Sequence, residues 1–151
     1  MEYRFFVEGH PEPQARPRFS LKNGYLRVHD KKESAEYKVA IYKAAWNAFA
    51  RDGKTMLTGG LTLELTVYRM FPSSWSRIKG ERAMKGAIMP DTKPDLDNYI
   101  KIALDGIGLK GYPKIIFEND AQIVQIIATK RYVKQTMVEG MDIKIREYTN
   151  E

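Results

Sequence analysis

Acidic side chains in two separate stretches of the chain could together hold a divalent cation. Asp95 and Asp97 stand in residues 93–101 (KPDLDNYIK), and Asp120 stands in residues 117–124 (FENDAQIV), at the entrance to an expected strand. Neighbouring carboxylates raise one another's pKa unless a cation relieves their repulsion. Three hard oxygen ligands with room left for water suit Mg²⁺, with Mn²⁺ as a substitute, and either ion can also engage a phosphate.

The start of a helix offers a second interpretation of two of these acids. Pro94 favours a helix that begins just after it, where Asp95 would cap the helix and Asp97 would complement its dipole. A calcium-binding loop is excluded, because neither Asp91 nor Asp95 is followed by the glycine and the glutamate that the sixth and twelfth positions of such a loop require.

Lys101 follows Asp97 by one helical turn, so both side chains are expected on one helix face. Beside a bound cation, its ammonium group could neutralise negative charge that develops on a phosphate during hydrolysis. The structural alternative is an Asp97–Lys101 ion pair on the helix surface, worth about 0.2–0.5 kcal/mol. Because Lys101 would lie between a metal site and a polyanion, we favour the functional role.

The composition limits the class of protein. The 151 residues are 43% hydrophobic, which fits one domain spanning 1–151. Lys and Arg number 25 against 19 Asp and Glu, a net charge of +6 that fits a polyanionic partner. The absence of cysteine excludes disulfides, thiolate zinc sites and cysteine nucleophiles. No apolar run reaches the roughly 20 residues that span a membrane, and the N-terminus does not resemble a signal peptide, so an intracellular protein without membrane contact is expected.

Basic residues near the acids are candidates for binding DNA phosphates. Arg16 and Arg18 flank Pro17 on a stiff segment and would clamp phosphates, and Lys93 would extend the contact. The alternative for each is an ordinary solvated charge. Trp75 and Tyr99 could stack on opened bases, but such aromatic residues more often belong to a core or an interface, so they are left out of the predicted site.

The order of expected elements predicts an α+β fold. Alternating or β-branched patterns predict strands at 2–8, 61–70, 121–133 and 139–148, and Asn23-Gly24 predicts a short hairpin. Helical spacing predicts long helices at 34–51, capped by Ser34, and at about 95–108, with a weaker one at 73–86. This order suggests a mixed β-sheet packed against two main helices.

At its acidic segments the chain resembles the RusA-type Holliday-junction resolvases. Those proteins carry a (Lys/Arg)-x-Asp-x-Asp-Asn-x-x-Lys block, a further Asp in the same helix, and an acidic turn that enters a strand downstream. The counterparts here are Lys93, Asp95, Asp97, Asn98, Lys101, Asp105 and residues 119–123. The likeness is close over 91–125 and looser in the segment 9–18. Asn119 stands where many members have the first acid of a pair, which makes Asp120 the expected ligand.

This resemblance implies a RusA-like fold and a homodimeric endodeoxyribonuclease that places paired symmetric nicks across a four-way junction in DNA recombination and repair. It implies a Mg²⁺ or Mn²⁺ ion held by Asp95, Asp97 and Asp120, with Lys101 as a further catalytic residue. It also implies a cytoplasmic protein encoded by a bacterium or a phage. The alternatives are a flap- or fork-specific nuclease on the same scaffold, a basic DNA-binding protein without catalysis, and an RNA-processing nuclease.

Overall fold

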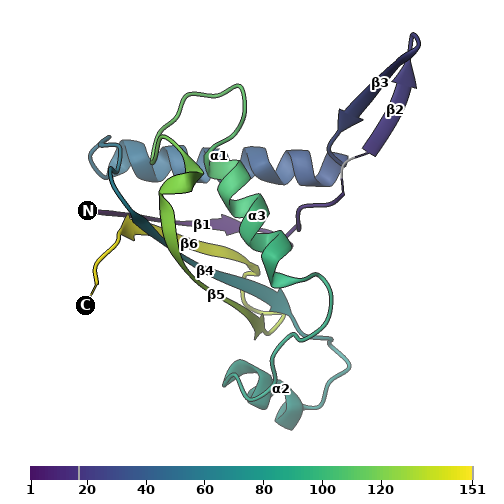
Figure 1. Ribbon diagram of the computed structural model, residues 1–151. Helices are drawn as coiled ribbons and strands as arrows, with labels where there is room; N and C mark the ends of the chain where they lie inside the picture. Colours follow the sequence, from purple (N-terminus) through teal and green to yellow (C-terminus); the bar gives the residue numbers. More distant parts are fainter. Residues whose placement is uncertain (17, 151) are drawn as a thin grey trace.

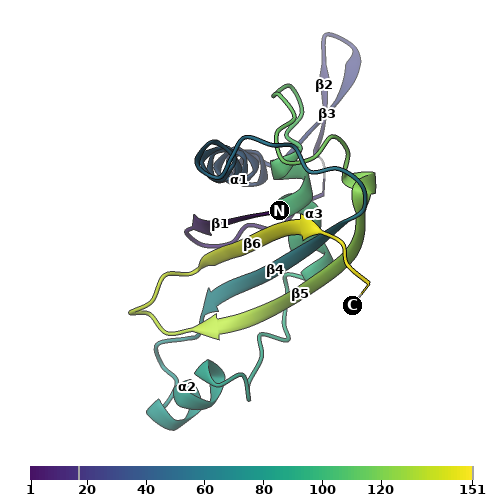
Figure 2. The same ribbon diagram turned by 90° about the vertical axis from the view of Figure 1, so that its left-hand side faces the viewer.

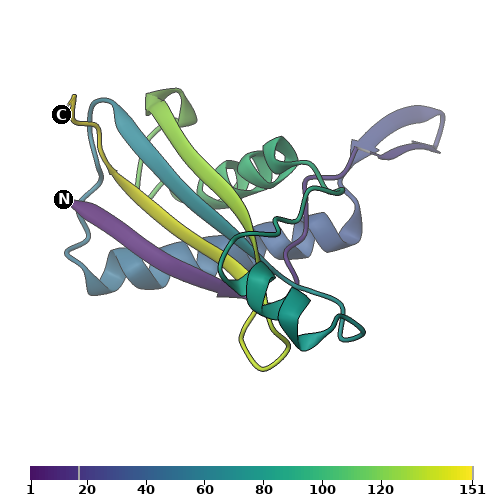
Figure 3. The ribbon, with the colours of Figure 1, turned by 90° about the horizontal axis from the view of Figure 1, so that it is seen from below.

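The computed structural model describes residues 1–16 and 18–150, and the side chain of Arg18 lies outside that description. A mixed four-stranded sheet runs in the order β1-β6-β4-β5 (Figure 3). Its strands are β1 (Glu2–Glu8), β4 (Leu61–Met70), β5 (Ile123–Val133) and β6 (Gly140–Glu147). The β4–β5 pair is parallel, whereas β6 pairs antiparallel with both β1 and β4. A mixed sheet was predicted, and it is present.

Alternation along the strands separates a buried face from an open one. In β4, Leu61, Leu63, Leu65 and Val67 are all buried, as the period-two pattern of this strand predicts. Two helices, α1 (Lys32–Arg51) and α3 (Leu96–Ile107), cover that face, and Figure 3 shows both behind the strands. The opposite face is polar and carries the ion pairs discussed below. The predicted α+β architecture with two main helices is therefore confirmed.

The two main helices cross in close contact at one glycine. A Cβ atom added to Gly106 of α3 would lie 2.6 Å from Cβ of Ile41 and 2.7 Å from its Cγ2. Ile41 is fully buried in α1, so it has little room to move. The absence of a side chain at residue 106 therefore lets α3 lie against α1, and this contact fixes the helix that carries most of the predicted acids.

Two excursions leave the sheet and helices at opposite ends of the molecule (Figure 1). One is a hairpin of β2 (Arg18–Lys22) and β3 (Tyr25–His29), and the other contains the short helix α2 (Arg77–Met84). Residues 18–31 hold four basic residues against one acid, and residues 71–90 hold four against one. Together these segments carry a net charge of +6, which equals that of the whole chain. The excess positive charge therefore lies outside the sheet and the two main helices.

The structure corrects the predicted cap of the first helix. The helix begins at Lys32, and Lys31 occupies the cap position without a side-chain hydrogen bond to the backbone. Ser34 lies inside the helix and is buried; its hydroxyl donates to the Pro13 carbonyl at 3.1 Å and accepts from the Ala15 amide at 3.3 Å. The prediction failed because this hydroxyl fastens the preceding loop to the helix.

The strands β1 and β4 have the predicted bounds, whereas other elements differ from the predicted bounds by a few residues. The weak helix expected at 73–86 is shorter and is capped by Ser76, whose Oγ accepts from the Lys79 amide at 3.2 Å. A 3-10 turn, η1 (Asp120–Gln122), replaces the first residues of the strand expected from 121. Within the described residues, no helix has both the length and the apolar character needed to cross a membrane.

Candidate metal and DNA site

Asp95 and Asp97 lie at the N-terminus of α3, as predicted. Asp95 occupies the cap position, yet its side chain makes no capping hydrogen bond; its Oδ2 instead accepts from Lys93 Nζ at 3.0 Å. The side chain of Lys93 is itself well exposed, so this pair is weakly held. Asp97 stands exposed in the first turn of the helix, where the helix dipole favours negative charge. The cap interpretation thus fails for Asp95, whose carboxylate is not used by the backbone.

Lys101 and Asp105 continue the same face of α3 at four-residue intervals. Among the described residues, the i,i+4 ion pairs on helices are Lys32–Glu36 on α1 and Arg77–Glu81 on α2, and Asp97 forms none with Lys101. The structural alternative for Lys101 therefore finds no support in the geometry. Its ammonium group is exposed, and its charge acts on carboxylates nearby, since it lowers the pKa of Asp30.

Asp120 opens the turn η1 immediately before β5. Asn119 shapes this turn: its Oδ1 accepts from the Ala121 amide at 2.8 Å, while Gln122 Oε1 accepts from the Asn119 amide at 3.0 Å. Asp120 therefore projects from a turn with a fixed backbone. It lines an open cavity of about 340 Å³ together with Asp105 and Lys114. Asn119 thus acts through its hydrogen bond to the backbone of this turn.

Asp105 lies between the two acidic segments, half-buried on α3. Burial raises the pKa of Asp105, the charges of Lys38 and Lys101 lower it, and the charges of Asp120 and Asp30 raise it. The charges of Asp120 and Lys101 therefore both act on the carboxyl group of Asp105. Helix α3 thus brings the downstream acid close to the face that also carries Asp97.

The three predicted ligands are not gathered at one point. The described residues contain no group of three acidic or histidine side chains close enough to share an ion. Asp120 lies beside Asp105, and Asp97 precedes Asp105 by two helical turns, a rise of about 12 Å at 1.5 Å per residue. In this structure Asp120 and the start of α3 therefore lie apart along the same helix face.

Two basic side chains from the sheet hold the loop that leads into α3. Arg69 of β4 donates to the Lys93 carbonyl at 3.0 Å. Lys130 of β5 donates to the carbonyls of Thr92 and Pro94 at 2.9 and 3.0 Å. Consecutive carbonyl groups are thereby tied to the sheet, which fixes the backbone just before Asp95. No sequence pattern indicated this role, because Arg69 and Lys130 resemble ordinary charged residues on a strand.

A further group of charged residues, not predicted, supports the other end of the α3 face. Lys38 of α1, whose side chain is only 12% exposed, binds Asp30 at 2.6 Å and approaches Asp105 at 3.9 Å. The hydrogen bond from Lys38 lowers the pKa of Asp30 despite partial burial. This bridge connects the base of the hairpin to α3. A lysine on an otherwise amphipathic helix carries no sequence signal that would distinguish it from a solvated one.

The predicted DNA contacts lie near the start of α3. The loop before the hairpin is fastened to α3, because the Gln14 amide donates to the Asn98 carbonyl at 3.1 Å. Arg16 follows on this loop and is exposed. Lys93 is exposed as well, whereas the side chain of Arg18 falls outside the described part of the chain. Tyr99 is fully buried, which removes it as a surface for stacking on DNA bases.

Known proteins resemble the chain over most of its length. The sequence model of the family described as "Endodeoxyribonuclease RusA" matches residues 8–146, nearly the whole chain. The chain is also 35% identical over 140 residues to the uncharacterized protein YqaN of Bacillus subtilis (strain 168), an alignment that covers 91% of this chain and 93% of that protein. The matched region includes both acidic segments and the strands β4 and β5. The chain belongs to the RusA endodeoxyribonuclease family.

Proposed function

We propose that the protein is a divalent-metal-dependent endonuclease that resolves four-way DNA junctions by paired symmetric nicks, in recombination and repair. Membership of the RusA family supports endodeoxyribonuclease chemistry. The metal dependence is inferred from the exposed carboxylates on and beside α3. Of these, Asp97 and Asp120 make no ion pair within the described residues. Action on such DNA would place the protein in the cytoplasm of a bacterium, encoded by its chromosome or by a phage.

The carboxylates fit Mg²⁺ or Mn²⁺ in their donor chemistry, because both ions prefer hard oxygen ligands. Asp95, Asp97 and Asp120 would hold the ion, with Asp105 beside Asp120 as a further negative group. The bound metal would supply a water of lowered pKa and would polarise the scissile phosphate. The ion's charge would offset the mutual repulsion of the carboxylates that hold it.

Lys101 would stabilise negative charge on the phosphate as the bond to the leaving oxygen lengthens. Its exposed position one turn after Asp97 lets its ammonium group reach a bound backbone without becoming a metal ligand. Arg16 and Lys93 would bind neighbouring phosphates and orient the strand, since contacts to the DNA backbone fix its register. Arg18 is a third candidate for this role.

We further propose that the active form is a homodimer. One set of carboxylates serves one strand, and two symmetric nicks require a second set related by a two-fold axis. A dimer would also double the basic surface, because each chain carries two positively charged excursions. The junction itself has approximate two-fold symmetry in its stacked form, which such a dimer would match.

The direct test is cleavage of a labelled four-way junction beside a linear duplex of the same sequence, with and without Mg²⁺. We expect junction-specific, Mg²⁺-dependent cuts at symmetric positions. Asp97→Asn should abolish cleavage and retain junction binding. The matched control is Asp52→Asn, which alters an exposed acid paired with Arg51 at the far end of α1 and should cleave as the parent does.

The alternatives predict different outcomes of the same assay. A flap- or fork-specific nuclease would cut those substrates in preference to the four-way junction. A DNA-binding protein without catalysis would bind the junction and cut nothing with either metal. An RNA-processing nuclease would cut an RNA substrate and leave DNA intact. Equal cleavage by Asp97→Asn and the parent protein would reject the metal assignment.

A further inference from the structure

A cavity of about 530 Å³ lies where α2 faces the ends of the strands, away from the acids of α3. One wall comes from α2 and the chain before it, and the other comes from Lys134 and Gln135, which follow β5. Figures 1 and 2 show α2 standing clear of the sheet at this end. Its volume falls within the range of roughly 300–1,000 Å³ that is typical of small-ligand sites.

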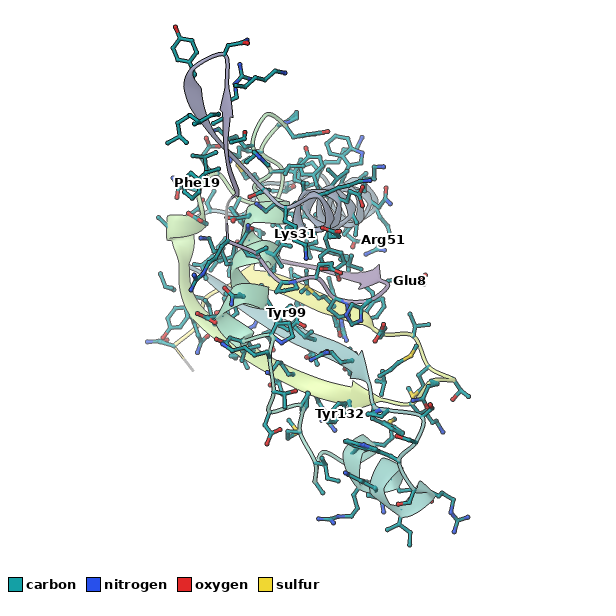
Figure 4. All side chains as sticks on the ribbon, turned by 90° about the vertical axis from the view of Figure 1, so that its right-hand side faces the viewer. Glu8, Phe19, Lys31, Arg51, Tyr99 and Tyr132 are labelled. Atoms are coloured by element: carbon teal, nitrogen blue, oxygen red, sulfur yellow. The ribbon has the colours of Figure 1, made fainter. Side chains whose placement is uncertain are left out.

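The floor of this cavity is aromatic and preorganised. Phe71 stacks on Trp75 with ring centroids 5.6 Å apart and an interplanar angle of 16°, and Tyr132 meets Trp75 edge-on at 5.2 Å. Figure 4 shows Tyr132 at the end of β5 next to α2. A Cβ atom on Gly80 would lie 2.9 Å from the Phe71 ring, so this glycine lets the ring lie directly against α2. Gln135 Nε2 donates to the Phe71 carbonyl and closes the far side.

The rim of the cavity is cationic. Arg77, Lys85 and Lys134 line it, against the single acid Glu81, whose charge is shared with Arg77 at 3.7 Å. The Nζ of Lys79 lies 4.1 Å from the Trp75 ring centroid and adds a further positive charge. An apolar aromatic floor beneath a positive rim matches a ligand with a flat ring and a phosphate.

The cavity and the acids of α3 are both linked to the edge strand β5. Arg131 donates to the Met84 carbonyl at 3.3 Å, and Lys130 next to it holds the carbonyls of Thr92 and Pro94. The strand β5 therefore anchors both the end of α2 and the loop before Asp95. A DNA strand that leaves the predicted metal site toward α2 would reach the cavity.

We propose that this cavity binds an unpaired nucleotide of the DNA substrate, with its base on the Phe71–Trp75 floor and its phosphate against Lys85 and Lys134. This proposal rests on the proposed function, and it adds a second, non-catalytic DNA site. Bases in a duplex are covered on both faces by their neighbours, whereas bases beside a branch point can be unstacked and received by aromatic side chains. The site would therefore favour branched or open DNA over linear duplex.

Trp75 allows a local test, because the chain contains only one other tryptophan, Trp46. In a Trp46→Phe background, Trp75 fluorescence is followed on titration with a short oligothymidylate without metal. A second titration uses an oligonucleotide of equal length whose sugars lack bases. We expect quenching by the first, and binding weaker by about 5- to 100-fold for the second, since base stacking on an aromatic ring has that order of effect. Absence of quenching, or equal affinity for both oligonucleotides, would overturn the proposal.

A pair of lysine variants tests the rim separately. Lys85→Ala with Lys134→Ala should weaken binding and reduce its salt dependence, because fewer counterions are released. Lys43→Ala, an exposed lysine of α1, is the control and should bind as the background does. Equal salt dependence in all three proteins would contradict the assignment. Thermal melting of each variant verifies that the fold is kept.

Failure of the nucleotide site and failure of the nuclease function would give different experimental results. Oligonucleotide binding at Trp75 without cleavage of any junction would reject the nuclease assignment and retain the nucleotide site. Metal-dependent junction cleavage without a Trp75 signal would do the reverse.

Discussion

Carboxylates on the open face of the sheet and carboxylates on α3 have opposite surroundings. On the sheet, Glu64 binds both Lys144 and Arg146 at 3.0 Å, and Asp142 binds Arg4 at 2.6 Å. On and beside α3, within the described residues, Asp97 and Asp120 make no ion pair. Glu64 and Asp142 are partly buried, whereas Asp97 and Asp120 are exposed, so the ion-paired acids are also the less accessible ones.

The charges of some acids are thus neutralised by basic side chains of the fold, whereas the charges of others can be neutralised by a bound cation. A paired carboxylate has little to gain from a cation, because its negative charge is already balanced. An unpaired one can become a ligand without first losing a partner, which lowers the cost of binding the ion. We therefore propose that Glu64 and Asp142 serve the fold and that Asp97 and Asp120 serve metal binding, whereas Asp95 would first exchange its exposed pair with Lys93 for the ion.

The largest expected effect is on catalysis. Asp120→Asn should lower the rate of junction cleavage by more than about 100-fold, because loss even of an outer-shell partner of a metal site typically costs 10- to 100-fold. Glu64→Gln should change the cleavage rate by no more than about twofold, because the Glu64 carboxylate is paired with Lys144 and Arg146 of the sheet. Single-turnover cleavage at saturating protein measures both. Equal losses in the two variants would remove the distinction between the faces.

A smaller effect is expected where the loop before α3 is held. Lys130→Met keeps the length of the side chain and removes the hydrogen bonds to the carbonyls of Thr92 and Pro94. Cleavage should fall by about 10- to 100-fold through misplacement of Asp95. The control Lys144→Met removes a lysine of the open face. If both variants cleave equally well, the loop does not depend on the clamp.

A further effect concerns stability in the presence of metal. At a Mg²⁺ concentration tenfold above its dissociation constant, linkage stabilises the folded protein by about 1.4 kcal/mol. For a chain of this length, that energy raises the melting temperature by about 3–6 °C. Glu64→Gln should retain the increase and Asp97→Asn should lose it, as calorimetry would report. An undiminished increase in Asp97→Asn would assign the ion to other ligands.

The smallest effect is the contribution of the sheet acids to acid stability. Burial alone would raise the pKa of Glu64, but hydrogen bonds from Lys144 and Arg146 lower it below its ordinary value. A carboxyl group with a lowered folded pKa stabilises the fold above its unfolded pKa, and this stability is lost as the pH falls through the folded value. Glu64→Gln should therefore be less stable than the parent near neutral pH, and the difference should shrink in acid. Urea titrations at both pH values measure it, and a constant difference would contradict the account.

Local patterns predicted the strands and the two main helices because the period of the buried residues differs between a strand and a helix. The alternation from Leu61 to Met70 gave the bounds of β4 without change. Ser34 shows where such reasoning fails: its type favours a helix cap, but its hydroxyl binds a loop that is distant in sequence. Boundaries that depend on tertiary hydrogen bonds were therefore displaced by a few residues.

The candidate site was predicted in its residue types and only partly in its arrangement. The spacing of Asp97 and Lys101 placed them on one helix face, because this follows from helix geometry. The position of Asp120 beside Asp105 depends on the path of the chain between α3 and η1, which no local pattern specifies. The cavity at α2 depends on residues 71–85 meeting residues 134–135, so Trp75 could not be separated from an ordinary core aromatic.

Mn²⁺ binding, followed by electron paramagnetic resonance, tests whether acids from two distant segments of the chain bind one cation. The signal of free Mn²⁺ gives the affinity of the parent protein and of the variants Asp97→Asn, Asp120→Asn and Glu64→Gln. Asp97→Asn and Asp120→Asn should each lose the same Mn²⁺ site, whereas Glu64→Gln should bind Mn²⁺ as the parent does. Parental affinity in Asp120→Asn would contradict this prediction.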